Sequence, residues 1–292
     1  MLRWRLLLGT IFISVLAGLL VLDHRLDTPG MILFPLALIL SLLVSHEYLG
    51  LLEARKLRPV KGVVYAGSLA VVAANAVPLF WQTQLEPLGW PLAAFALALL
   101  AAFLGEMRRY EGPGEVMERL ALAVLGVAYS GLLLTFIVQM RLLGENGRWG
   151  VPAIASLLIV VKMGDIGAYT VGRLLGKHPM APVLSPGKTL EGAAGGLAFA
   201  CLGSWLALNC LLPLVLGDPW PKNSWGWLPY GVVVGAAGMF GDLAESLIKR
   251  DLGSKDSSTW MPGFGGVLDL LDSVMFAGPV AFLFWKLGIV GP

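Results

Sequence analysis

The chain has 292 residues, of which 57% are hydrophobic and only 14% are charged, and its formal net charge at pH 7 is +2. Soluble globular domains carry about 25% charged residues, so this composition excludes an ordinary soluble domain, a disordered chain and a collagen-like chain. The small net charge argues against a nucleic-acid partner, and two cysteines are too few for a disulfide framework. A polytopic membrane protein remains.

Nine apolar segments follow one another along the chain, and each is long enough to cross a membrane as a helix. A helix needs about 20 mostly apolar residues to span the bilayer and satisfies its own backbone there. The segments cover residues 6–22, 31–52, 63–80, 89–105, 119–138, 150–172, 190–216, 227–248 and 266–290. We therefore predict an all-α, polytopic transmembrane bundle that forms a single integral membrane domain over residues 1–292.

The connections between these segments differ in their content of Lys and Arg, and this difference sets the expected orientation. Cytoplasmic loops of membrane proteins are the richer in both residues. The basic connections lie at residues 55–61, 108–119, 173–188 and 249–255. We therefore predict a cytoplasmic N-terminus, with two long cytoplasmic connections over residues 173–189 and 249–265.

Glycines recur at helical spacing in the seventh and eighth segments, for example at Gly192 and Gly196 and at Gly231 and Gly235. Small residues four positions apart let membrane helices approach closely. The pattern favours packing between helices of the same chain, and it leaves open a homodimer.

Polar side chains form stripes on three of the later helices. Ionisable residues cost about 2.5–3.5 kcal/mol each at a helix centre on insertion scales, so their clustering indicates a function. Within each stripe the spacing of three, four or seven residues places the side chains on one helical face. The stripes are Lys162, Asp165 and Tyr169; Asp242, Glu245, Ser246 and Lys249; and Asp269, Asp272 and Ser273.

Carboxylates dominate these stripes, and they would repel one another without a cation or protons between them. Oxygen donors without Cys or paired His suit Mg²⁺, which binds one or two carboxylates together with substrate phosphates. The alternative is that the side chains reach the membrane surface or pair internally, as Lys162 could with Asp165.

The connection after the sixth segment is basic and rich in glycine. It contains Arg173, Lys177 and the run from Ser185 to Thr189, which reads Ser-Pro-Gly-Lys-Thr. Such backbone next to a helix N-terminus suits phosphate groups. It is not a Walker A loop, because Pro182 stands where that motif requires glycine.

Read together, these elements resemble the integral-membrane phosphatidate cytidylyltransferases, also called CDP-diacylglycerol synthases. The similarity covers roughly residues 160–280 and rests on spaced motifs. They are Asp165 to Tyr169, Gly172-Arg173, Gly176 to His178, Ser185 to Gly192, Gly241 to Leu243, Glu245-Ser246, Lys249-Arg250, Lys255-Asp256, Pro262-Gly263, Gly265-Gly266, Asp269 and Asp272.

The resemblance implies transfer of a cytidylyl group from CTP to phosphatidate at a bilayer. It also implies that Mg²⁺ is required, and it leaves open a second metal ion. Residues 149–292 would then carry the catalytic helices and cytoplasmic loops, and residues 1–148 mainly scaffold helices. We expect Asp242 and Asp269 to bind the metal. The expected catalytic residues are Asp242, Asp269, Lys249, Lys255 and Asp272, and the expected substrate-binding residues are Ser185, Lys188, Thr189, Arg173, Lys177, Ser246, Arg250 and Asp165.

Two positions depart from the family pattern. Phe264 and Leu270 stand where the family has His and Arg, so the chain lacks a titratable group and a guanidinium at these places. A slow or non-catalytic member is one interpretation, but the motif residues that remain favour an active enzyme.

Two other functions fit parts of the pattern. One is a membrane transferase that uses CTP on another lipid phosphate or on a polyprenol, and the other is an ion-coupled transporter. Because we find no soluble extension and no targeting peptide, we expect a bacterial inner membrane with the active site facing the cytoplasm.

Overall fold

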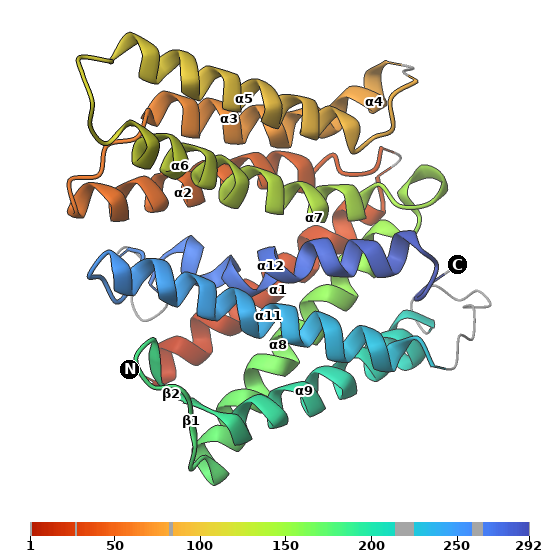
Figure 1. Cartoon of the computed structure of the whole chain (residues 1–292). Helices are drawn as coiled ribbons and strands as arrows, with labels where there is room; N and C mark the ends of the chain where they lie inside the picture. The colour runs from red at the N-terminus through yellow and green to blue at the C-terminus, as the bar shows by residue number, and fades with distance from the viewer. Residues whose placement is uncertain (1, 27, 82–83, 214–224, 259–264, 292) are drawn as a thin grey trace. The chain divides into compact units, whose positions relative to one another are not determined.

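The computed structural model describes residues 2–26, 28–81, 84–213, 225–258 and 265–291 (Figure 1). Almost all of its regular structure is helical, which confirms the all-α fold. The helices are α1 (Leu2–His24), α2 (Leu33–Ala54), α3 (Lys61–Ala73), α4 (Val77–Phe80), α5 (Gly89–Arg108), α6 (Val116–Val127), α7 (Leu133–Arg141), α8 (Gly150–Leu175), α9 (Leu190–Trp205), α11 (Trp227–Asp251) and α12 (Val267–Lys286).

Among the described residues, eight helical segments are long and apolar enough to cross a membrane. They are Leu33–Ala54, Lys61–Phe80, Gly89–Arg108, Val116–Arg141, Gly150–Leu175, Leu190–Leu211, Trp227–Asp251 and Val267–Lys286. Each coincides with one of the expected crossings, so the polytopic membrane fold is confirmed. The first expected crossing falls on α1, whose described apolar part is the shorter stretch Ser14–His24.

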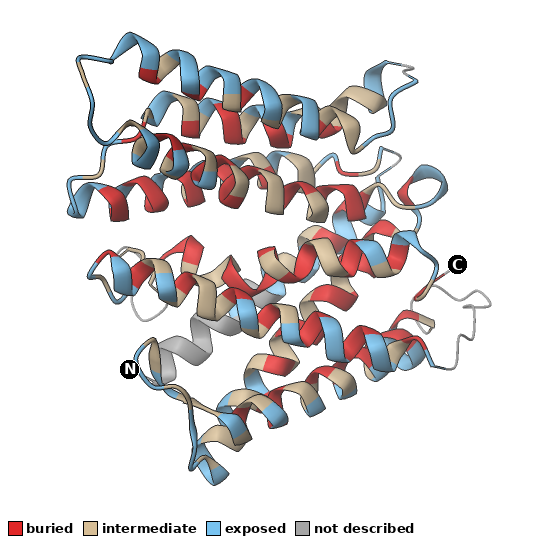
Figure 2. Ribbon diagram, in the orientation of Figure 1, coloured by how far each residue is buried: buried red, intermediate tan, exposed pale blue. Residues whose placement is uncertain are grey.

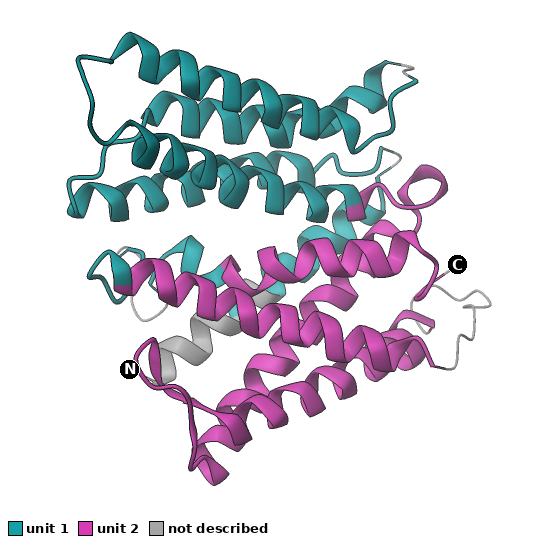
Figure 3. Cartoon of the chain, viewed as in Figure 1, with its two compact units in different colours: residues 1–139, 251–270 teal, residues 140–250, 271–292 magenta. Residues whose placement is uncertain are grey.

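The chain divides into two compact units (Figure 3). Unit 1 comprises residues 1–139 and 251–270, and unit 2 comprises residues 140–250 and 271–292. The first boundary lies close to the expected division after residue 148, but a short segment late in the sequence belongs to unit 1. The division into two compact units does not test whether the chain forms a single integral membrane domain, which stays a prediction.

Unit 1 is built around α3, which contacts α2, α5 and α6. Buried hydroxyls link these helices: the Ser130 Oγ atom lies 2.8 Å from Ser45 Oγ and 2.7 Å from Ser68 Oγ. Ser130 belongs to a π-helical turn over Ala128–Leu132, between α6 and α7. Hydrogen bonds of this kind hold membrane helices together where lipid offers no polar partner. The outward side of α5 is mostly exposed (Figure 2).

Unit 2 is held together by glycines at helix crossings. A Cβ atom on Gly167 of α8 would lie 2.7 Å from the carbonyl oxygen of Gly195 on α9. One on Gly231 of α11 would lie 2.6 Å from the Cα atom of Cys201 on α9. Real Cβ atoms do not approach backbone so closely, so the small residues serve helix packing within the unit.

A short β-hairpin joins α8 to α9 in unit 2. Strands β1 (Pro179–Ala181) and β2 (Ser185–Thr189) are antiparallel, with Ala181 opposite Ser185. Thr189 is the N-cap of α9, because its hydroxyl accepts a hydrogen bond from the Gly192 amide at 3.1 Å. Glu191 accepts hydrogen bonds from the amides of Lys177 and His178 at 3.0 and 3.2 Å and so fixes the start of the hairpin.

Candidate active site

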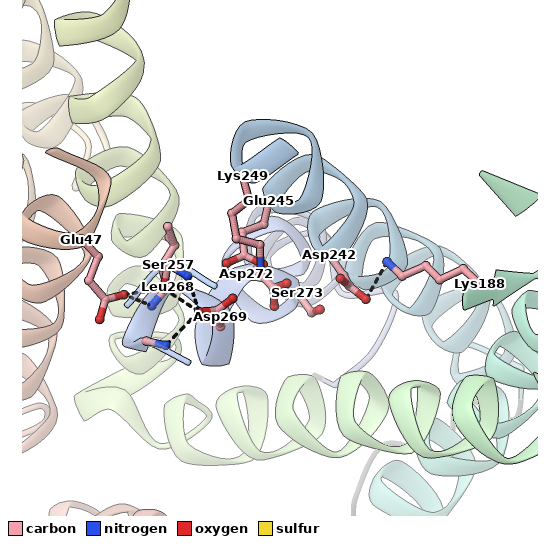
Figure 4. Close-up of polar contacts among 11 residues, drawn as sticks. Glu47, Lys188, Asp242, Glu245, Lys249, Ser257, Leu268, Asp269, Asp272 and Ser273 are labelled. Carbon is pink, nitrogen blue, oxygen red and sulfur yellow. Dashed lines mark hydrogen bonds and ion pairs between the residues drawn. The ribbon is translucent and has the colours of Figure 1, made fainter. Parts of the chain in front are cut away.

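Three carboxylates from two helices meet in unit 2. Asp242 and Glu245 lie one turn apart on α11, and Asp272 lies on α12; each offers an oxygen within 4.8 Å of the other two. Glu245 and Asp272 are only 2% and 5% exposed, whereas Asp242 is partly open to solvent. Figure 4 shows the three side chains gathered between the two helices. We call Asp242, Glu245 and Asp272 the carboxylate triad.

The triad forms because α11 and α12 approach closely at a glycine. A Cβ atom on Gly241 would lie 2.7 Å from the carbonyl oxygen of Asp272 and 2.8 Å from the Cβ atom of Phe276. Only glycine fits this contact, and the next residue, Asp242, is thereby brought beside α12. Gly241, which precedes the acidic stripe of α11, thus allows the three carboxylates of the triad to come together.

Two lysines pair with the triad. Lys188 on β2 places Nζ 2.7 Å from Asp242 Oδ2, and Lys249, one turn beyond Glu245, places Nζ 2.8 Å from Glu245 Oε2 (Figure 4). The Nζ atom of Lys188 is shielded from solvent, and Lys249 is 9% exposed. Charges paired away from water interact much more strongly than charges at a surface. The site therefore combines three acids with two cations, and the Lys249–Glu245 pair is the more buried of its two ion pairs.

The donor set of the triad fits a hard divalent cation. All three residues offer carboxylate oxygens, which are the ligands that Mg²⁺, Ca²⁺ and Mn²⁺ prefer, and no sulfur or imidazole belongs to the group. Three carboxylates held within such a short distance repel one another, and two lysines do not balance all three charges. Asp242, Glu245 and Asp272 are therefore the residues that would hold a metal ion in unit 2.

A second acidic cluster lies in unit 1, at the N-terminus of α12. Glu47 of α2 accepts hydrogen bonds from the amides of Val267 and Leu268 at 2.9 and 2.8 Å. Asp269 Oδ2 accepts from the amides of Ser257 and Gly266 at 2.9 and 2.8 Å. Most amides in the first turn of a helix lack an intrahelical partner, so carboxylates are well placed to cap them. We call Glu47, Ser257, Gly266 and Asp269 the capping cluster.

The Ser257 hydroxyl lies between the two acids of the capping cluster. Its Oγ atom is 2.6 Å from Asp269 Oδ2 and 3.0 Å from Glu47 Oε2, and it can donate its one proton to either carboxylate (Figure 4). Gly265 makes room for this arrangement with a φ of +82°, a conformation that favours glycine. The Gly265-Gly266 pair of the sequence motif thus allows both carboxylates to approach the helix start.

The two metal ligands expected from the sequence occupy different settings. Asp242 belongs to the carboxylate triad. Asp269 belongs to the capping cluster, where its Oδ2 atom accepts three hydrogen bonds. Asp272, expected as a catalytic residue, joins Asp242 in the triad. A role of Asp269 in metal binding stays a prediction.

The expected phosphate-binding residues are spread over several elements. Of the hairpin residues, Lys188 reaches the triad, while Ser185 is half-buried at the start of β2 and Thr189 caps α9. Arg173, at the end of α8, donates a hydrogen bond to the Tyr169 hydroxyl at 2.8 Å.

The remaining expected residues lie nearer to solvent. Lys177, Arg250 and Lys255 have exposed side chains, and Ser246 is half-buried on α11. Asp165 pairs with Lys162 at 3.1 Å, as the alternative interpretation of the α8 stripe anticipates. Their roles toward substrate stay predictions.

Of the two departures from the family motif, Phe264 lies outside the described residues, and Leu270 is half-buried on α12.

The structure adds three residues to those selected from the sequence. Glu245 stands in the α11 stripe but was not among the expected site residues, and it is the most buried member of the triad. Glu47 and Ser257 have no place in the motifs. Glu47 nevertheless gives a signal, since it is an acid inside an otherwise apolar segment. Ser257 gives none.

Known proteins resemble this chain along most of its length. The family whose model matches the chain is described as the Cytidylyltransferase family, and the match covers residues 3–287. A protein from Staphylococcus epidermidis named phosphatidate cytidylyltransferase is 31% identical over 270 residues, which is 92% of this chain and 95% of that protein. Proteins with the same name from Staphylococcus aureus and Staphylococcus haemolyticus are each 30% identical over the same shares.

These matches cover the N-terminal helices as well as the motifs of the later half, whereas the resemblance noted in the sequence covered roughly residues 160–280. That resemblance is confirmed, and so is the expectation of a nucleotidyltransferase enzyme. The chain is an integral membrane protein of the cytidylyltransferase family.

Proposed function

We propose that this enzyme transfers a cytidylyl group from CTP to phosphatidate and thereby makes CDP-diacylglycerol and pyrophosphate. The observation that carries the proposal is the carboxylate triad with its two lysines, at motif positions of a chain in the cytidylyltransferase family. The curated relatives named above carry the name of this activity. Family membership also favours a transferase over an ion-coupled transporter.

The proposed reaction joins two anionic substrates. An oxygen of the phosphatidate phosphate forms a bond to the α-phosphorus of CTP, the bond from that phosphorus to the bridging oxygen of the β-phosphate breaks, and pyrophosphate leaves. The nucleophile is already an anion, so no strong general base is required. The main obstacle is repulsion between negative charges, which cations held at a partly buried site reduce.

Lys188 and Lys249 are suited to that role. Both ammonium groups are held near the triad by ion pairs of 2.7 and 2.8 Å. A phosphate group that enters the site can take over these ammonium contacts, since Lys binds phosphate as a point charge. Lys188 is carried by the hairpin and Lys249 by α11, so the two cations approach the site from different elements.

The family implies a divalent metal ion, and we propose Mg²⁺ held by Asp242, Glu245 and Asp272. When bound, such an ion neutralises phosphate charge and orients the phosphates for in-line displacement. The carboxylates of the triad supply the oxygen ligands. Asp269 of the capping cluster is proposed as a ligand of a second metal ion.

The membrane setting of the reaction follows from its two substrates. Phosphatidate stays in the bilayer and CTP comes from the aqueous side, so the site should lie near one membrane surface. The excess of Lys and Arg in the connections at 173–189 and 249–258 supports a cytoplasmic site. With bacterial relatives, we propose a bacterial inner membrane. We also propose a homodimer, on the ground of the family resemblance alone, because the glycine-spaced helices pack against one another within unit 2.

The deciding experiment supplies the purified full-length protein in detergent with labelled CTP, Mg²⁺ and phosphatidate. We expect labelled CDP-diacylglycerol, with an equal amount of pyrophosphate, and no product after chelation of divalent ions. A polyprenol phosphate in place of phosphatidate tests the related transferase. Failure to form product, while one of the staphylococcal relatives is active in the same assay, would refute the proposed activity.

A further inference from the structure

We infer that Glu47, on the second helix and outside the family motifs, is a positioning residue for the reaction: it holds the N-terminus of α12, which carries Asp269 and Asp272. The inference rests on the proposed function, because its effect is measured on the turnover of CTP and phosphatidate. It gives a specific task to a helix in the half of the chain that the sequence presents as scaffold.

The first step of the argument is the bonding of the Glu47 carboxylate. Its Oε1 atom accepts from the Val267 amide at 2.9 Å, and its Oε2 atom accepts from the Leu268 amide at 2.8 Å. These are the first two residues of α12, whose amides have no carbonyl partner within the helix. An acid near a helix N-terminus is also stabilised by the helix dipole.

The second step is that the residue at the N-cap position of α12 has no side chain. The residue before the helix is Gly266, which has no side chain to accept these hydrogen bonds. A Cβ atom there would lie 2.2 Å from Glu47 Oε2, so the carboxylate of α2 occupies the place where a capping side chain would begin. Glu47 therefore supplies from 220 positions away what a Ser or Asp N-cap supplies locally.

The third step links Glu47 to the functional acids. The Ser257 hydroxyl lies within hydrogen-bond distance of both Glu47 and Asp269. Asp269 in turn accepts from the Gly266 amide, which completes the cap from the helix side. Asp272 follows one turn later on the same helix. The direction of the first turn of α12, and thus of Asp269, depends on this set of bonds.

The burial of Glu47 makes the arrangement rigid. The residue is 5% exposed, its carboxylate accepts from two amides at once, and it also lies within hydrogen-bond distance of the Ser257 hydroxyl. Replacement by Gln keeps the shape but turns one acceptor into an N–H donor that faces backbone N–H groups. One cap bond is then lost and an unfavourable donor contact takes its place.

The experiment compares Glu47→Gln with a matched control, Glu106→Gln. Glu106 is also a buried acid of unit 1, 2% exposed, but it pairs with Arg119 at 2.8 Å and does not contact α12 in the bonds described. Full-length variants in detergent are assayed for kcat, for the KM of CTP and for the Mg²⁺ concentration that gives half-maximal activity. Thermal stabilisation by Mg²⁺ with CTP is measured without turnover.

For Glu47→Gln we expect kcat to fall about 10- to 100-fold, the range typical for residues that orient metal ligands. The Mg²⁺ requirement should rise, and the thermal stabilisation by Mg²⁺ with CTP should shrink, while the KM of CTP changes little. Glu106→Gln should lower the melting temperature but keep the kcat and the Mg²⁺ requirement of the parent. In the double variant with Ser257→Ala, the losses should not add, because both residues act through one set of bonds.

Several results would overturn the inference. One is a Glu47→Gln enzyme with parental kcat and Mg²⁺ requirement, and another is a loss matched by Glu106→Gln, which would indicate a general effect on folding. If Glu47→Gln does not accumulate in the membrane, the Ser257→Ala variant is assayed in its place. A parental Mg²⁺ requirement in Ser257→Ala would contradict the inference. Absence of product with the parent enzyme would instead refute the proposed function. The thermal stabilisation by Mg²⁺ with CTP, compared between the parent and Glu47→Gln, would then still test the role of Glu47.

Discussion

The two acidic clusters differ in what their carboxylates bind. In the capping cluster of unit 1, Glu47 and Asp269 accept hydrogen bonds from backbone amides, which cannot move without moving the helix. In the carboxylate triad of unit 2, Asp242 and Glu245 pair with the ends of long lysine side chains. Hydrogen bonds from backbone amides fix a helix in place, whereas a lysine side chain can exchange a carboxylate partner for a phosphate. The first cluster thus suits positioning and the second suits substrate exchange.

The largest expected effect comes from removing a charge of the triad. Asp272→Asn should lower kcat by more than about 100-fold, because losing a metal ligand should cost more than the 10- to 100-fold typical of its supporting residues. The melting temperature should stay close to that of the parent, since the like-charge repulsion within the triad is relieved. Activity assays and thermal unfolding in detergent measure the two effects.

Asp269→Asn gives the contrast. It should lower both turnover and melting temperature, because Asp269 also caps α12. Equal melting temperatures for the two variants would break the distinction between the clusters.

The next effect concerns the two glycines whose lack of a side chain leaves space for the close contacts of each cluster. Gly241→Ala would place a methyl group against the α12 backbone at Asp272, and Gly266→Ala would place one against the Glu47 carboxylate. Overpacking typically costs about 1–3 kcal/mol, so both variants should unfold at lower temperature. Gly241→Ala should also raise the Mg²⁺ requirement, because it separates the helices that carry the triad.

Gly50→Ala on α2 is the matched control, since a Cβ atom there meets nothing within 4 Å. It should leave stability and activity close to the parent values. An unchanged Mg²⁺ requirement in Gly241→Ala would show that the close approach of α11 and α12 does not matter for the triad.

The smallest effect is expected for Lys188. Lys188→Ala removes the ion pair to Asp242 and a phosphate contact, and we expect the KM of CTP to rise about tenfold, which corresponds to the 1.4 kcal/mol scale of one such contact. Lys188→Arg should recover part of the affinity, since the charge is kept. Lys286→Ala, an exposed cation at the end of α12, serves as the control. A lower kcat with unchanged KM would move Lys188 from binding to another role.

The fold was predictable from the sequence to a large extent, because hydropathy reports spans directly. The expected segments at 150–172 and 227–248 correspond to α8 (Gly150–Leu175) and α11 (Trp227–Asp251). The short hairpin from Pro179 to Thr189 was not anticipated, since its strands are brief and lack a period-two apolar pattern.

The site was predictable only where its members share one helix. Asp242 and Glu245 stand one turn apart, so their common face follows from helical periodicity. Which acids of different helices meet depends on the packing at Gly241, and no local pattern reports that contact. The link from Glu47 to Leu268 spans 221 positions and was therefore beyond any argument from spacing.

The capping of α12 by Glu47 has a consequence for biosynthesis. The ribosome makes α2 long before Leu268 exists, so α2 enters the bilayer with an acid whose two amide donors are still to be synthesised. Translocon insertion of an acid near the centre of a helix costs about 2.5–3.5 kcal/mol. This free-energy cost remains until α12 is made and its amides bind Glu47. In a chain truncated before α12 the cost is never offset. Completion of translation is thereby coupled to the burial of one early side chain.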